Sequence, residues 1–110
     1  MEFAKRRGPA AVPPVVVGGV RYEPLRQAKV HGFAQDGGVI VAVDEASGRT
    51  LWTAQLYTTA FDRAEERDVQ EVYVQELALD AARHALRATD EQGRVWFLDL
   101  ATRAVTPVHP

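Results

Sequence analysis

The sequence predicts an all-β protein built from antiparallel hairpins, and three observations carry this prediction. Residues 38–47 and 93–102 follow one pattern, in which a Gly, a mostly apolar run and an Asp are followed by X-Ala-Ser/Thr. The two aspartates, Asp44 and Asp99, lie 55 residues apart. Short runs of β-branched and aromatic residues recur along the chain between Gly-, Asp- and Pro-containing turns. We therefore expect about eight short strands folded into a small sandwich or barrel.

The N-terminal part is expected to contain a flexible arm and a first pair of strands. Residues 1–13 carry a Lys-Arg-Arg run followed by Gly-Pro and then the first residue of a Pro-Pro pair, which favours a loose, extended path. Residues 14–110 are expected to form a single all-β domain. Its first strand is Val15 to Val17, and Val20 to Leu25 is its hairpin partner. Pro24 confines that second strand to an edge or an end, because proline cannot donate a ladder hydrogen bond.

The strongest strand signal lies at Val39 to Asp44, which is almost entirely β-branched. An Ala-Ser-Gly-Arg turn follows, and residues 51–57 return with alternating polar and apolar side chains. The sequence therefore predicts a hairpin over residues 39–57.

Residues 58–71 are an acid-rich interruption, which we interpret as an acidic loop. A strand is expected to resume at Val72 and run to Leu79. The apolar residues at 69, 72, 73 and 77 also fit helical spacing, so a helix across residues 62–78 is the alternative.

The C-terminal part repeats the hairpin pattern. Residues 80–83 are expected to turn, 84–89 and 94–100 to pair across a turn that ends in Gly93, and 105–108 to close the chain. The second predicted hairpin therefore covers residues 84–99.

Composition excludes several classes of protein. The chain has 110 residues, a length typical of one domain, and no Cys, which rules out disulfides and thiolate metal sites. A net charge of −2 gives no overall attraction to nucleic acid or anionic lipid, although the basic run at 5–7 could touch an acidic partner. Gly and Pro interrupt the N-terminal apolar stretch, so we expect no signal peptide, no membrane span and a cytoplasmic protein.

The two hairpins resemble repeats of β-propeller proteins. Residues 77–106 resemble a WD-repeat-like blade: a strand ending at Asp80, a turn, a strand, a Gly-ended turn and a strand ending at Asp99. Residues 38–57 are similar to a repeat of the pyrroloquinoline-quinone type, with Asp44, the Ser-Gly turn and Trp52 on the return strand. The second copy departs from that pattern after Asp99. It lacks counterparts of Gly48 and Trp52, and Arg103 and Thr106 lie nearby instead.

The resemblance implies a two-blade propeller fragment as the alternative fold. Propellers have about four to eight blades, so one chain of this length cannot close a ring. We therefore expect a homo-oligomer, with Trp52 or Trp96 at the seam between subunits. No cofactor site carries over from the resemblance. Tyr57 and the segments Phe61-Asp62 and Asp68-Val69-Gln70 also resemble a widespread bacterial family, from which no activity follows.

Candidate metal ligands are few. The weak candidate is an acidic cluster that could offer carboxylate oxygens to Ca²⁺, but it lacks the spacing and central Gly of an EF-hand loop and contains two arginines. Its members are Asp62, Glu65, Glu66 and Asp68. The histidines, His31, His84 and His109, are too dispersed for a metal site. We expect no bound cofactor.

Candidate catalytic groups are equally sparse. Ser47 sits in a turn rather than in a Gly-x-Ser-x-Gly elbow. Asp44 and Asp99 are expected to accept hydrogen bonds from backbone N–H groups of their turns. Trp52 and Trp96 fit strand packing, or contact with a ligand or a partner. The sequence thus favours a non-enzymatic binding or protein-interaction module, and the alternative is a small enzyme or ligand-binding protein with a pocket near Trp52 or Trp96.

Overall fold

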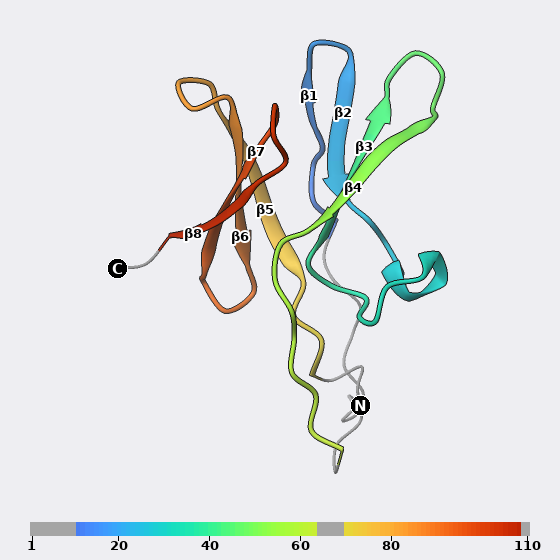
Figure 1. The fold of residues 1–110 in the computed structure, drawn as a ribbon, viewed down its shortest axis with the longest axis vertical. Coiled ribbons are helices and arrows are strands. Elements are labelled where there is room, and N and C mark those ends of the chain that lie inside the picture. Colours follow the sequence, from blue (N-terminus) through green and yellow to red (C-terminus); the bar gives the residue numbers. More distant parts are fainter. Residues whose placement is uncertain (1–10, 64–69, 109–110) are drawn as a thin grey trace, which may run out of the picture.

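The computed structural model describes residues 11–63 and 70–108, and these residues form two four-stranded antiparallel sheets. Figure 1 shows the sheets side by side, with the segment that leaves β4 extending below them. Strands that are consecutive in the chain are neighbours in each sheet, so each sheet is a simple meander. The prediction of an all-β antiparallel fold is confirmed. The sheets are not closed into a barrel, and they are consistent with two propeller-blade-like units.

The first sheet contains β1 (Val15–Val17), β2 (Val20–Pro24), β3 (Val39–Asp44) and β4 (Thr50–Gln55). The run of β-branched residues in β3 places it at an inner position, where it pairs with both β2 and β4. Pro24 is the last residue of β2. This position at the end of a strand suits proline, because proline has no N–H to donate to a neighbouring strand. A 3-10 turn, η1 (Ala28–His31), fills part of the connection from β2 to β3.

The second sheet contains β5 (Val74–Asp80), β6 (Ala85–Asp90), β7 (Val95–Asp99) and β8 (Val105–Val108). The alternative of a helix across residues 62–78 is wrong for its final part, because β5 begins at Val74. Pairing with β6 gives the backbone of β5 its hydrogen bonds, and this outweighs the helical spacing of a few apolar residues. Residues 64–69 lie outside the described part of the chain.

The core lies between the two sheets. One face of the first sheet contributes Tyr22, Ile40 and Ala42, and the second sheet contributes Leu86 and Leu98 to the same cluster. The segments between the sheets add more members to this cluster, namely Leu56, Tyr57 and Val72. The sheets therefore pack through their apolar faces, which removes these side chains from water.

The repeated sequence marks equivalent places in the two sheets. Residues 39–44 form β3 and residues 95–99 form β7, and each is the third strand of its sheet. In the turn after β3 the N–H of Gly48 donates to the carbonyl of Asp44, and after β7 the N–H of Arg103 donates to that of Asp99, both at 2.8 Å. The sequence repeat therefore corresponds to a structural repeat.

Among the residues that the structure describes, no helix is long and apolar enough to cross a membrane.

Candidate functional site

A cluster of buried polar side chains joins the segments that lead into the two sheets. Glu71 is 1% exposed, and its carboxylate accepts hydrogen bonds from the N–H groups of Asp36 at 2.9 Å and Gly37 at 3.0 Å. The ammonium of Lys29 lies 3.7 Å from the same carboxylate. Gln35 is also buried, donates to the carbonyls of Gly37 and Tyr57, and accepts from the N–H of Thr59. Backbone groups thus use the polar atoms of both side chains.

Tyr57 belongs to the same structural cluster. Its hydroxyl donates to the carbonyl of Val72 at 2.6 Å, and burial raises the pKa of this hydroxyl far above its usual range. The phenol therefore stays protonated and acts as a donor. Gly38 packs against the ring, since a Cβ at that position would lie 2.7 Å from a ring carbon.

Asp90 is fully buried at the end of β6 and holds the following turn. Its carboxylate accepts from the N–H groups of Gln92 at 2.8 Å and Arg94 at 3.0 Å. The guanidinium of Arg94 and the indole N–H of Trp96 donate to its other oxygen at 2.8 Å and 3.3 Å. These bonds compensate the cost of burying the charge. We conclude that the buried polar groups of Glu71, Gln35 and Asp90 serve the fold.

The predicted role of the repeated aspartates in the turns is confirmed. Asp44 accepts from the N–H and the hydroxyl of Ser47. Asp99 accepts from the N–H groups of Ala101 and Thr102, each at 2.8 Å, and these bonds lower the pKa of its carboxyl. The serine hydroxyl is thus engaged in a turn.

The two tryptophans lie against aromatic partners at the packing interface. The Trp52 ring is 5.8 Å from that of Tyr22, and the guanidinium of Arg103 from the second sheet lies 5.0 Å over it. The Trp96 ring is 5.3 Å from that of Tyr57. Both tryptophans pack against the core cluster. Their proposed contact with a ligand or partner stays a prediction.

The candidate metal ligands do not form a metal site in the described part of the chain. Of the acidic cluster only Asp62 lies in the described residues, and Glu65, Glu66 and Asp68 lie outside them. His109 lies outside as well, while His31 ends η1 and His84 lies in the β5–β6 turn. Within residues 11–63 and 70–108, no three His, Asp or Glu side chains gather as a metal site would require.

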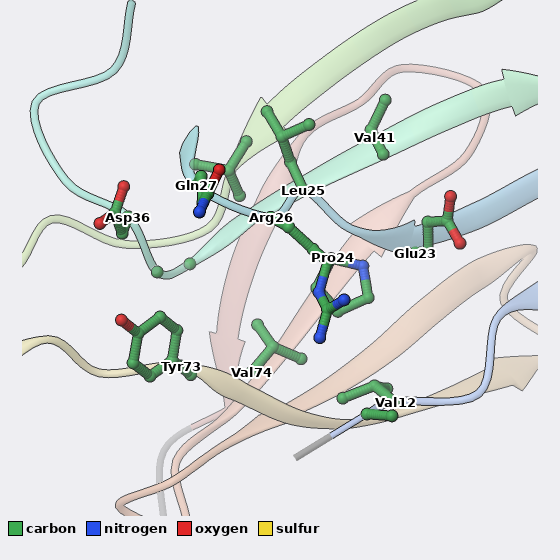
Figure 2. A pocket seen from close by; sticks show the side chains of 14 residues that line it. Val12, Glu23, Pro24, Leu25, Arg26, Gln27, Asp36, Val41, Tyr73 and Val74 are labelled. Carbon is green, nitrogen blue, oxygen red and sulfur yellow. The ribbon is translucent and has the colours of Figure 1, made fainter. Parts of the chain in front are cut away.

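A groove of about 740 Å³ opens between the end of β2 and the start of β5. Figure 2 shows its walls: Pro24 and Arg26 on one side, Val74 on the other, and Val12 from the segment before β1. A smaller hollow of about 320 Å³ lies beside Phe97 on the second sheet. Neither cavity is lined by Trp52 or Trp96.

Sequence reasoning did not find this groove, although one of its causes is visible in the sequence. The β1–β2 register pairs Val15 with Tyr22, so continuing it by two residues would place Pro13 opposite Pro24. Proline has no N–H to donate, so neither residue can extend the ladder. β1 and β2 therefore separate at this point and leave room between β2 and β5.

Comparisons with protein families, with curated proteins and with solved structures give no match for this chain.

Proposed function

We propose that this chain is a non-enzymatic protein-interaction module and that its partner binds in the groove between β2 and β5. The groove is the observation that carries the proposal. It offers a large concave surface with mostly apolar walls and a few charged groups, which is the usual composition of a binding site. The buried polar side chains elsewhere support this choice, because their hydrogen bonds to backbone groups already give them structural roles.

We further propose that the two sheets are blades similar to those of WD-repeat and quinone-enzyme propellers, and that copies of the chain associate. The matching turns after β3 and β7 support the first part. Two large apolar side chains support the second: Val16 is 51% and Leu51 is 50% exposed. Val16 pairs with Arg21 and points with it to the face opposite the core residue Tyr22. An interface that covered these two side chains would remove them from water, which favours association.

A two-armed binding screen tests the module proposal. The full chain is first heated with single divalent metals, nucleotides and sugars, and it is then panned against a displayed library of random heptapeptides. We expect peptides to be enriched and the small ligands to leave the melting temperature unchanged. A large, saturable shift from one small ligand would contradict the proposal, because ligand at about 100 times Kd stabilises by about 2.7 kcal/mol.

A further inference from the structure

We propose that the groove binds an extended peptide segment that carries a carboxylate, with Arg26 as its anchoring residue and the backbone groups at the end of β2 and the start of β5 as its hydrogen-bond partners. This inference rests on the proposed function and adds the chemical class of the ligand and its mode of binding.

The end of β2 presents a backbone edge to the groove. The N–H of Leu25 donates to the carbonyl of Val39 at 2.8 Å, so Leu25 faces β3. Because the C=O and N–H of a trans peptide bond point in opposite directions, the carbonyl of Pro24 faces away from β3. β1 pairs only as far as Tyr22, so this part of the edge has no strand partner among the described residues.

The start of β5 presents a second backbone edge. The carbonyl of Tyr73 accepts from the N–H of Glu91 at 2.9 Å, which turns Tyr73 toward the β6–β7 turn. The next residue, Val74, lies opposite Asp90 in β6. The two residues share no backbone hydrogen bond, because the N–H of Asp90 donates to the carbonyl of Arg94 instead. The N–H and carbonyl of Val74 therefore face the groove. β5 is an edge strand of its sheet, and edge strands can accept an added strand from a partner.

Three charged residues line the groove, and Arg26 is the one without a charged partner among the described residues. Glu23 pairs with Arg21 at 3.4 Å, and Asp36 accepts from the N–H of Lys29 at 3.0 Å, so both carboxylates have partners. Arg26 is exposed, lines the groove and makes no ion pair with the described residues. In Figure 2 its guanidinium projects between Pro24 and Val74. A guanidinium in this position can bind a carboxylate through two parallel hydrogen bonds.

The walls of the groove fit the rest of such a peptide. Val12, Leu25, Val39 and Val74 line it, and their side chains suit the apolar residues of an extended segment. Alternating side chains along a strand would place one set against these walls and the other toward solvent. We therefore expect ligands with β-branched residues at alternate positions and one Asp, Glu or terminal carboxylate.

The test uses heptapeptides enriched by panning on the full chain. Each is synthesised in three forms: unchanged, with its acidic residue replaced by the amide, and with alternate backbone nitrogens methylated. Affinities are measured by fluorescence anisotropy for the wild type, Arg26→Glu and the control Arg49→Glu, which changes an exposed arginine outside the groove. We expect Arg26→Glu and the amide form each to weaken binding at least about tenfold. The methylated form should not bind, and Arg49→Glu should have little effect.

Amide hydrogen exchange supplies an independent readout. Bound peptide should slow exchange at the N–H of Val74, because this group would become hydrogen-bonded. If no peptide is enriched, the proposed function itself fails. If peptides bind with equal affinity to the wild type and Arg26→Glu, or leave the Val74 amide unprotected, the module stands and this inference is overturned.

Discussion

Glu71 shows how a single side chain can connect the two halves of this molecule. It precedes β5, yet its carboxylate holds the N–H groups of Asp36 and Gly37, which precede β3. Gly37 is required at this contact, since a Cβ there would collide with the carbonyl of Val72. The segment that enters the second sheet and the loop that enters the first are therefore fixed to each other.

Replacing Glu71 should destabilise the whole fold. Glu71→Gln keeps the shape of the side chain but turns an NH₂ group toward one of the two backbone donors. We expect a loss of about 1–3 kcal/mol in the free energy of unfolding, because a buried donor is left without an acceptor. Urea denaturation measures this loss, with the exposed Glu76→Gln as control. Equal stability of the two variants would contradict a structural role for Glu71.

Arg103 adopts a backbone conformation that favours glycine. Its φ is 66°, and Gly48 has a φ of 76° at the equivalent place after β3. A non-glycine residue there costs about 1 kcal/mol or more. The contact of its guanidinium with the Trp52 ring, of the kind that contributes about 0.5–1 kcal/mol, offsets part of this cost.

Two substitutions separate these opposing effects at residue 103. Arg103→Ala loses the ring contact and keeps the backbone cost, so we expect it to be less stable than the wild type by about 0.5–1 kcal/mol. Arg103→Gly loses the same contact but removes the backbone cost, and it should be more stable than the alanine variant by about 1 kcal/mol. Thermal unfolding compares them. An alanine variant as stable as the glycine variant would show that the backbone imposes no cost.

At the scale of elements, strands and turns were predictable because their causes are local. β3 is defined by its β-branched residues, and the turns after Asp44 and Asp99 by side chains that bond to their own backbone. Glu71 was not predictable as a buried group, because its acid-rich surroundings suggested a solvated loop. The groove depends on the distance between the end of β2 and the start of β5, and no local sequence pattern encodes the distance between two strands of different sheets.

The turn after β7 should make stability depend on pH. Hydrogen bonds from the N–H groups of Thr102 and Ala101 lower the pKa of Asp99. A group whose pKa is lower in the folded state stabilises the fold above its unfolded pKa and loses this effect as pH falls through the folded value. We expect the wild type to exceed Asp99→Asn in stability at pH 7, and the difference to shrink below about pH 4. A difference that is constant from pH 7 to pH 2 would contradict this origin.

At the scale of the whole molecule, the proposed association of copies predicts a mass above 12.1 kDa. Light scattering at micromolar concentration should give a multiple of this value. Leu51→Glu should lower it, since a charge would then occupy an exposed apolar position. Val30→Glu is the matched control, because Val30 is 77% exposed but lies in η1. A monomer mass for the wild type would remove the proposal that several copies complete a propeller.

The order of strands also has a consequence for synthesis on the ribosome. The first sheet uses only residues 15–55, so all its strands emerge before the second sheet begins. At about 5–20 residues per second, the residues from the end of β4 to the end of β8 take roughly 3–11 seconds to appear. During that interval Tyr22, Ile40 and Ala42 have no second sheet to cover them. We therefore expect the uncovered apolar face of the nascent first sheet to make this stage of synthesis prone to aggregation.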